Sequence, residues 1–341
     1  MVLTTRINYR TFIRGCLRVV VVIAAMFSAL PLLGIDLYTA LPTVYRGTIA
    51  NPYALSQTIT IAAVLTLAAA AALIPFRSGF VNLGGEGQIT MGALGATAVL
   101  LGIGGDGSLW LALLALVVAV VVGSLWGGLS AFLFETFGAN AVITTLMFNY
   151  ISFAIADYAR STIWPDAISP QSRSFPTGDA LPDAGSYGAS PIAFVIVTVV
   201  WVLIILLFKW TNFGFRIRTT GENPTAAARF GFRPVQTRIV SMLIGSGLAG
   251  LGGGILVLVL NRALTPDVSA NYGYVGIAAA LLIGLRPPLL PLGAILFAVM
   301  TVGGSTLSVV AQVSPDVSLV AVAAAVMIFL ATQSRRPGSS V

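Results

Sequence analysis

Long apolar runs separated by short polar connections fill most of this 341-residue chain. Each run is close to the roughly 20 apolar residues that a helix needs to cross a bilayer. The pattern therefore predicts an all-α polytopic membrane protein with about 10 transmembrane helices. The predicted spans are residues 17–33, 55–75, 88–102, 109–134, 141–158, 192–208, 239–260, 274–285, 292–311 and 317–332.

Two of these spans, 88–102 and 274–285, are too short to cross a bilayer cleanly. We expect them to be broken or re-entrant helices, which a membrane tolerates only where they are buried in protein or line a cavity. Glycines and an asparagine precede each of them, and the two would run in opposite directions. This echo would fit an inverted repeat of five spans plus five; a chance likeness between glycine-rich helices is the alternative.

The positions of the charges predict the orientation. Ten spans place both termini on one side, and that side carries 14 of the 18 basic residues but only three of the 11 acidic ones. Basic loops face the cytoplasm, so both termini are expected there. We expect a cytoplasmic segment 1–16, one transmembrane domain 17–332 and a cytoplasmic tail 333–341. Within the domain, 159–191 is an external loop and 209–238 a cytoplasmic segment.

Composition excludes several classes of protein. Mean hydropathy is +0.96 and only 9% of residues are charged, whereas a soluble domain has about 25%. Histidine is absent, which removes the commonest general base and metal ligand. No phosphate-binding loop of the Gly-x4-Gly-Lys-Ser/Thr type occurs. We therefore expect no enzyme activity, no metal site, no cofactor and no nucleic-acid partner for this chain, with lipid as its surroundings.

Polar residues cluster at the start of the short span after residue 79, in the sequence GFVNLGGEGQ. Asn82 and Glu86 are four residues apart and share a face if this stretch is helical. In a structural interpretation, Glu86 caps the amides of a broken helix or pairs with Arg77 or another cytoplasmic arginine. In a functional one, Asn82, Glu86 and Gln88 line a permeation path, since ionisable groups at membrane depth are costly and usually paired or functional.

A second polar group lies in the span that begins AVITTLMFNY at residue 141. Thr145 and Asn149 are one helical turn apart, and Phe148 neighbours them. The simple interpretation is hydrogen bonding between helices. The alternative is a polar and aromatic patch that faces a path for a solute with a flat ring or a sugar face. The spacings Gly123-x3-Gly127 and Gly250-x3-Gly254 predict close helix packing.

A short charged island, GENPTAAARFGF at residues 221–232, separates two long apolar runs. It predicts a helix of about two turns that starts at Asn223-Pro224, with Glu222 at its positive end, and that Gly231 stops. Such a helix could dock in the groove of a partner and transmit motion. The alternative is a structured loop that carries positive-inside residues.

Four segments together resemble the permease subunits of ABC importers of the branched-chain amino acid, ribose and nucleoside superfamily, most of all its nucleoside and simple-sugar branch. They are RSGFVNLGGEGQITMGA (77–93), NAVITTLMFNYIS (140–152), TTGENPTAAARFGF (219–232) and YGYVGIAAALLIGL (272–285). They occur in the family's order, and the likeness covers most of the chain from about residue 55. The first and third segments are fairly specific, the other two less so.

The resemblance implies a permease that forms the path for a nucleoside or simple-sugar-like solute in the bacterial cytoplasmic (inner) membrane. Separate ATP-binding subunits would bind ATP and Mg, a second related permease would pair with this one, and an extracytoplasmic substrate-binding protein would dock outside. A heterodimer is preferred over a homodimer, because the EGQ at 86–88 is typical of one of two paired nucleoside permeases. The resemblance assigns coupling to the ATPase to Glu222, Asn223, Pro224, Ala226, Ala227, Arg229 and Phe230.

One departure from the family falls at Gly84-Gly85, where the family more often has a branched residue before the glutamate. The local geometry there, and the identity of the solute, stay open. The alternative function is an ion-coupled secondary transporter, which needs ionisable groups near the bilayer midplane. Asp157 and Glu135 fall near predicted span ends, so the sequence places neither of them there.

Overall fold

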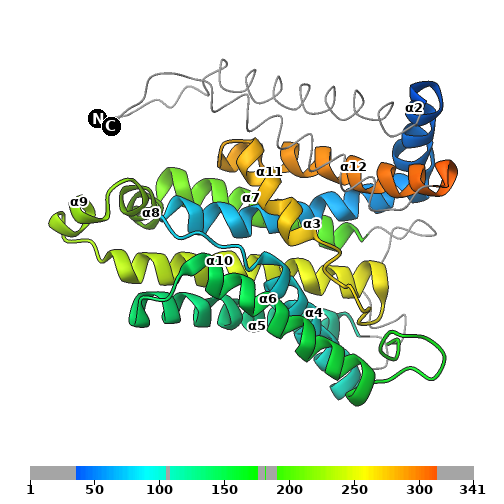
Figure 1. The fold of residues 1–341 in the computed structure, drawn as a ribbon, viewed down its shortest axis with the longest axis horizontal. Helices are drawn as coiled ribbons and strands as arrows, with labels where there is room; N and C mark the ends of the chain where they lie inside the picture. The colour runs from blue at the N-terminus through cyan, green and yellow to red at the C-terminus, as the bar shows by residue number, and fades with distance from the viewer. Residues whose placement is uncertain (1–35, 105–107, 176–180, 182–189, 313–341) are drawn as a thin grey trace.

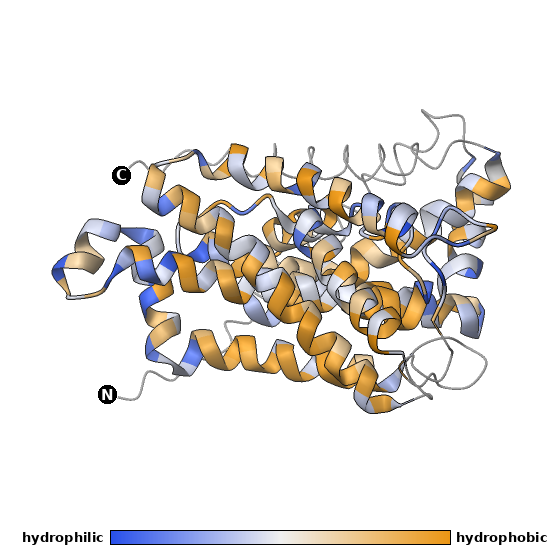
Figure 2. Ribbon diagram, turned by 90° about the horizontal axis from the view of Figure 1, so that it is seen from below, coloured by the Kyte–Doolittle hydropathy of each residue, from blue (hydrophilic) through white to orange (hydrophobic). Residues whose placement is uncertain are grey.

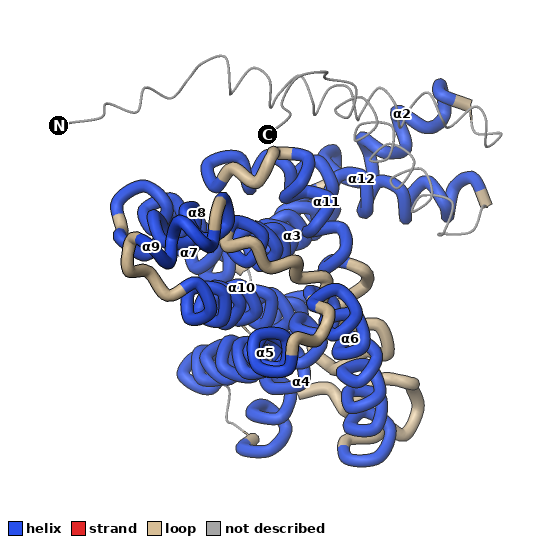
Figure 3. The backbone as a smooth tube through the Cα atoms, turned by 60° about the vertical axis from the view of Figure 1, so that its left-hand side comes forward, coloured by secondary structure: helices blue, strands red, loops and turns tan. Residues whose placement is uncertain are grey.

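The computed structural model describes residues 36–104, 108–175, 181 and 190–312, and these residues form a bundle of helices (Figures 1 and 3). Seven helical stretches in this part are long and apolar enough to cross a membrane. They are α3 (Pro52–Arg77), α4 (Gly85–Ile103), α5 (Leu109–Phe137), α6 (Ala141–Tyr158) continued by η3 (Ala159–Ile163), α7 (Pro191–Trp210), α10 (Pro234–Ile255) continued by η5 (Leu256–Asn261), and α12 (Leu290–Ala311) preceded by η6 (Pro287–Leu289).

Helices cover the predicted spans that lie within the described residues, except that α11 (Tyr272–Leu282) ends three residues before the predicted end at 285, and α6 agrees with its prediction at both ends. The predicted spans 17–33 and 317–332 lie outside the described residues. Two helices were not predicted. One is α2 (Leu37–Tyr45) with η2 (Arg46–Ala50), where the Asp36 carboxylate accepts the N–H of Tyr38 at 3.3 Å. The other is α8 (Asn212–Glu222), which Thr211 caps.

Helix α3 is the central element of the bundle. It packs against α10, α11 (Tyr272–Leu282) and α12, and 89% of its most apolar window is buried. A run of five alanines at 68–72 gives this part of α3 only small side chains, so neighbouring helices can approach its backbone closely. By contrast, only 17% of the most apolar window of α6 with η3 and 22% of that of α7 is buried, as expected for helices on the outside of the bundle that face lipid or a partner.

Glycines bring α4, α5 and α10 into backbone contact. A Cβ atom on Gly92 would lie 2.3 Å from the Cα of Gly250, and one on Gly123 would lie 2.8 Å from the same atom. Neither position has room for a side chain. The packing role predicted for Gly123 and Gly250 is therefore confirmed.

The helices α4 and α11 both begin inside the bundle rather than at its ends. The first turn of α4 lies beside Asn149, which is in the middle of α6, and the first turn of α11 lies against Gly85. Residues 78–84, which connect α3 to α4, are not helical. These starts agree with the expectation of broken helices.

Polar residues gather where α8 and α9 (Pro224–Arg229) extend beyond the bundle (Figures 1 and 2). We call this the α8–α9 end and the other the opposite end. The Arg238 guanidinium of α10 pairs with the Glu135 carboxylate of α5 there, at 2.9 Å. This ion pair, with the Glu135 side chain only 6% exposed, joins the ends of two packed helices.

Candidate functional site

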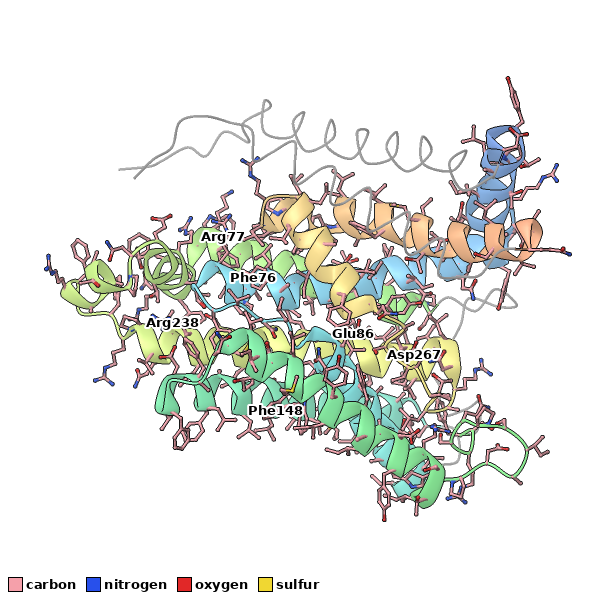
Figure 4. All side chains as sticks on the ribbon, viewed as in Figure 1. Phe76, Arg77, Glu86, Phe148, Arg238 and Asp267 are labelled. Carbon is pink, nitrogen blue, oxygen red and sulfur yellow. The ribbon has the colours of Figure 1, made fainter. Side chains whose placement is uncertain are left out.

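The Glu86 side chain caps the start of α11. Its Oε1 accepts the backbone N–H of Gly273 at 2.7 Å and that of Tyr274 at 3.2 Å. A carboxylate at a helix N-terminus satisfies amides that have no partner within the helix, and it interacts favourably with the helix dipole. The capping interpretation of Glu86 is therefore confirmed. Figure 4 shows Glu86 deep in the bundle, between the α8–α9 end and the loop that carries Asp267.

Arg77 does not pair with Glu86, so that part of the prediction is wrong. Its guanidinium donates from Nε and Nη2 to the carbonyl of Leu285, at 3.0 and 2.8 Å. Leu285 follows the end of α11, where carbonyl groups lack helical partners. Side chains from Arg77 and Glu86, on either side of the 78–84 connection, thus hold the two ends of α11.

Asn149 caps the start of α4 from the middle of α6. Its Oδ1 accepts the N–H of Gly87 at 2.9 Å, while its Nδ2 donates to the Leu83 carbonyl at 3.0 Å and the Tyr274 hydroxyl at 3.1 Å. One amide therefore joins α6, the 78–84 connection, α4 and α11. Hydrogen bonding between helices, the simple interpretation of this residue, is confirmed.

Asn82 and Gln88 bond to each other beside these caps. The Nδ2 of Asn82 donates to Oε1 of Gln88 at 3.1 Å, and the Nε2 of Gln88 donates to Oδ1 of Asn82 at 3.0 Å. The expected helical face shared by Asn82 and Glu86 is wrong, because α4 begins only at Gly85. The Asn82 Oδ1 also accepts the N–H of Gly84 at 2.9 Å, a local bond that competes with helix formation.

We call this set of residues the junction: Asn82, Glu86, Gln88, Thr145, Asn149, Gly273 and Tyr274. Thr145 belongs to it because its Oγ1 accepts the N–H of Leu83 at 3.3 Å. Five of the six residues predicted to line a path are at most 1% exposed: Asn82, Glu86, Gln88, Thr145 and Asn149. Only Phe148 lies apart: its ring packs edge-on against Trp126, with centroids 5.1 Å apart. The junction is closed in this structure, and a path-lining role remains a prediction.

Backbone packs on backbone where the two short helices meet. A Cβ atom on Gly273 would lie 2.3 Å from the amide nitrogen of Glu86, and one on Gly85 would lie 3.3 Å from the Cα of Gly273. The unusual glycine before Glu86 thus permits close approach of α4 and α11. Sequence reasoning missed Gly273; the signal was a glycine between two tyrosines at the start of a span too short to cross.

A small pocket with both polar and apolar lining residues lies between the junction and the opposite end of the bundle. Its lining includes Thr90 of α4, Asp157 and Arg160 near the end of α6, and the loop residues Asp267 and Ser269. The Thr90 hydroxyl donates to the Glu86 carbonyl at 2.9 Å. The Arg160 guanidinium pairs with the Asp157 carboxylate at its rim. The pocket therefore reaches to within one helical turn of the junction.

The charged island forms the α8–α9 hairpin, defined as α8, α9 and residues 230–232. The Asn223 Oδ1 accepts the N–H of Ala226 at 2.9 Å, and Pro224 is the first residue of α9. At the other end, Gly231 has φ +80° and the N–H of Phe232 bonds to the Ala227 carbonyl at 3.1 Å, which is a Schellman ending. The predicted start and stop are confirmed. Glu222, however, ends α8 and does not lie in the first turn of α9.

The hairpin is braced against the bundle on one side and exposed on the other. A Cβ atom on Gly221 would lie 2.2 Å from the Arg77 carbonyl, so α8 touches the end of α3. The Phe232 ring packs on α8, with its centroid 6.0 Å from that of Phe215. Of the residues predicted to couple, Ala227 is buried and Ala226 half-buried, whereas five are exposed. The exposed ones are Glu222, Asn223, Pro224, Arg229 and Phe230.

A helical bundle of membrane-length spans, with interrupted helices that meet at a polar junction, defines a polytopic membrane transport protein. Residues 54–331 match the family model described as the permease component of branched-chain amino acid transport systems, and the chain belongs to that family. It is a multi-pass protein of the cytoplasmic membrane, with the predicted kinship to nucleoside and sugar permeases.

Three relatives illustrate this kinship. The glucose ABC transporter permease protein TsgB13 of Haloferax volcanii is 27% identical over 89% of this chain and 83% of its own length. The putative glucose ABC transporter permease protein TsgC13 of the same organism is 30% identical over 72% of this chain and 75% of its own length. The guanosine ABC transporter permease protein NupP of Bacillus subtilis is 27% identical over 86% and 85%. No solved structure matches the chain.

Proposed function

We propose that this chain is the permease subunit of an ABC importer and that it forms the path for a nucleoside or simple-sugar-like solute. The observation that carries the proposal is the α8–α9 hairpin. It is helical, capped at both ends and braced against α3, yet it presents Arg229 and Phe230 to the outside. The relatives named as glucose and guanosine permeases support the class of solute.

The α8–α9 end faces the cytoplasm in this proposal, as do both termini. Lys209, Arg229 and Arg233 lie at that end, and basic residues favour the cytoplasmic side. Asp157 and Asp166 belong to the opposite end, where hydrogen bonds from the amides of Ile168 and Ser169 hold the pKa of Asp166 below its usual value. This carboxylate is therefore charged at neutral pH, as suits a loop in water.

Two contact patterns support the proposed total of ten spans in a five-plus-five inverted repeat. Helix α3 packs against α11 and α12, and α10 packs against α4 and α5. The second helix of each proposed half thus packs on the third and fourth helices of the other half. Both third helices, α4 and α11, begin inside the bundle. Packing of equivalent helices of each half against the other half is expected of a transporter built from an inverted repeat.

In this proposal, the subunits that hydrolyse ATP and the protein that captures the solute are separate chains. ATP-binding subunits, which hold the ATP and Mg, dock on the α8–α9 hairpin, and a substrate-binding protein docks on the external loop 159–191. A second permease completes the path; the two permeases TsgB13 and TsgC13 of one organism support a heterodimer. Transport then requires that the junction open in one state, with a solute affinity that differs between states.

One observation favours the alternative of an ion-coupled transporter. Glu86 is an ionisable group buried at the level of the middle of α6, a depth that the sequence did not assign to it. The contacts of Glu86 argue against a role in binding a transported ion, because its carboxylate already accepts two backbone N–H groups of α11. Uptake that needs an ion gradient and no ATP would favour the alternative.

The test replaces Ala228, an exposed residue in the last turn of α9, with lysine. Lysine near a helix C-terminus suits the helix dipole, so the hairpin should remain folded. We expect Ala228→Lys to insert normally but to lose ATP-driven uptake and the co-purifying ATP-binding subunit. Ala50→Lys, at an exposed alanine of η2 where the proposal places no partner, is the matched control. Normal uptake by Ala228→Lys would remove the coupling role.

Ala227 is unsuitable for this test although the sequence assigned it to coupling. Its side chain is 1% exposed, so a bulky charge there would disrupt the hairpin itself. Loss of uptake in such a variant would not separate folding from docking. The structure thus selects Ala228 as the position that reports on the partner alone.

A further inference from the structure

Three arginines from separate parts of the chain meet where α3, α8 and the end of α11 come together. Arg77 is the last residue of α3, and its guanidinium bonds to the carbonyl of Leu285, the residue before Arg286. Arg218 lies on α8 one helical turn before Gly221, which packs against the backbone carbonyl of Arg77. We call Arg77, Arg218 and Arg286 the arginine cluster. Figure 4 shows Arg77 between α8 and the end of α11.

The arginine cluster carries positive charge that its own chain does not neutralise. Arg77 is within electrostatic range of both other arginines and of the Glu222 carboxylate. Neither of the two ion pairs formed by the described residues involves the cluster. Residues 1–35 and 333–341 contain no Asp or Glu that could join it. Because like charges held close together repel, the cluster favours an anion from outside the chain.

The cluster has N–H groups to offer such an anion. The Nη1 of Arg77 has no acceptor among the described residues, and the same holds for the guanidinium groups of Arg218 and Arg286. All three side chains are half-buried, and their unbonded nitrogens reach the surface. The two bonds to the Leu285 carbonyl fix the plane of the Arg77 guanidinium. A fixed guanidinium edge matches two oxygens of a phosphate group.

The depth of the cluster follows from its contact with α7. Trp201 of α7 donates its indole N–H to the carbonyl of Pro287, the residue after Arg286, at 3.0 Å. Trp201 precedes Trp210, the last residue of α7, by nine residues, or about 13 Å of helix. A tryptophan beside Lys209 at the end of an apolar span marks the membrane surface. Arg286 is therefore rooted below that surface, and arginines so placed extend their charge to the level of lipid headgroups.

We propose that the arginine cluster binds the phosphate group of an anionic phospholipid of the cytoplasmic leaflet. Basic pockets between membrane helices on this side suit such headgroups. The outside of α7, the helix that adjoins the cluster, offers the acyl chains the exposed aliphatic residues Val199, Val202 and Leu203. A soluble anion gains only the charge contacts, whereas a lipid gains both. The proposal rests on the proposed function for one point, that the α8–α9 end faces the cytoplasm.

The bound phosphate connects the α8–α9 hairpin to the bundle. Arg218 belongs to the hairpin, whereas Arg77 ends α3 and Arg286 lies between α11 and η6. An anion among the three removes their mutual repulsion and gives them a shared acceptor. The position of the hairpin relative to the bundle therefore depends on the lipid composition of the membrane.

The test measures lipid binding to the full-length chain, purified with the subunits that accompany it. Thermal unfolding and native mass spectrometry compare phosphatidylglycerol, phosphatidylcholine with the same acyl chains, and inorganic phosphate. Phosphatidylglycerol should raise the unfolding temperature and stay bound, phosphatidylcholine much less. Arg286→Gln should weaken phosphatidylglycerol binding about fivefold, which corresponds to about 1 kcal/mol for one basic residue. Arg233→Gln, at an exposed arginine of the same end outside the cluster, is the matched control and should bind as the parent does.

Arg218→Gln, on another element, should weaken binding as Arg286→Gln does, and it replaces that variant if unfolding without lipid shows Arg286→Gln to be unstable. Equal binding of the two lipids, or unchanged binding by the variants, would overturn the site. Equal protection by inorganic phosphate would assign the cluster to a soluble anion, and displacement of the lipid by the ATP-binding subunit would assign it to that subunit.

The lipid measurement uses neither ATP nor solute, so the two proposals fail separately. Selective phosphatidylglycerol binding by a chain without ATP-driven uptake would leave the lipid site standing and remove the proposed function. ATP-driven uptake by a chain that does not distinguish the lipids would remove the lipid site alone.

Discussion

The junction and the α8–α9 hairpin are both polar regions in an apolar chain, and they use their polar groups in opposite ways. In the junction, Glu86 and Asn149 bond to backbone on distant elements of the same chain. In the hairpin, the Asn223 side chain caps the start of its own helix, while Arg229 and Phe230 are exposed. The junction thus joins distant elements of one subunit, whereas the hairpin leaves side chains exposed, and it is there that we propose another subunit docks.

The physical reason lies in what surrounds each region. A buried polar group without a partner costs about 1–3 kcal/mol, so a junction inside the bundle must pair its groups with protein. The hairpin extends beyond the bundle, where water can satisfy its charges at little cost. In this chain, a polar residue is therefore evidence of a partner surface only where no other group of the chain binds it.

The largest effect is expected from Gly273→Ala, which acts on the junction alone. The added Cβ would lie 2.3 Å from the Glu86 amide nitrogen, and backbone there cannot move aside as a flexible side chain can. Overpacking of this kind costs roughly 1–3 kcal/mol, and the upper end applies to contact with backbone. The thermal unfolding temperature of the purified protein should fall clearly.

Gly102→Ala in α4 is the control for that measurement, because nothing lies within 4 Å of a Cβ atom at this position. Alanine has the higher helix propensity, so this variant should be as stable as the parent protein or slightly more so. Equal unfolding temperatures for the two variants would show that the contact between α4 and α11 does not hold the junction together.

A smaller effect, confined to assembly, is expected from Phe230→Ala in the hairpin. The Phe230 side chain is 79% exposed, so its loss should leave the stability of the isolated permease unchanged. If it anchors a partner, truncation should weaken binding of the ATP-binding subunit by about 2 kcal/mol, or roughly 30-fold. Tyr38→Ala, at an 89% exposed aromatic residue of α2, is the control. Unchanged binding would place the partner elsewhere.

The smallest effect is expected from Glu86→Gln. The amide oxygen can still accept both N–H groups of α11, but the charge that interacts with the helix dipole is lost, at a cost of about 1 kcal/mol. Stability should decrease slightly, and uptake should keep its rate and its order of preferred solutes. A stable Glu86→Gln protein with a changed preference would instead show that Glu86 contacts the solute, and the contrast between the two regions would no longer hold.

Sequence reasoning succeeded where the signal was local. Helix α9 begins and ends as predicted because Asn223, Pro224 and Gly231 act on backbone within a few residues of themselves. It failed for Asn82, which the spacing rule placed on a helix that in fact begins at Gly85. It also missed α8, whose start depends on the Thr211 side chain bonding to the N–H of Gly214.

The sequence by itself determined the membrane class, the spans within the described residues and the exposed hairpin, because hydropathy and helix capping act over short distances. Only the tertiary structure decided what Glu86 does. Its acceptors are used by Gly273 and Tyr274, 187 and 188 residues away. The bond exists because glycines let α4 and α11 meet backbone to backbone, and no local pattern specifies which distant amides such a meeting brings within reach.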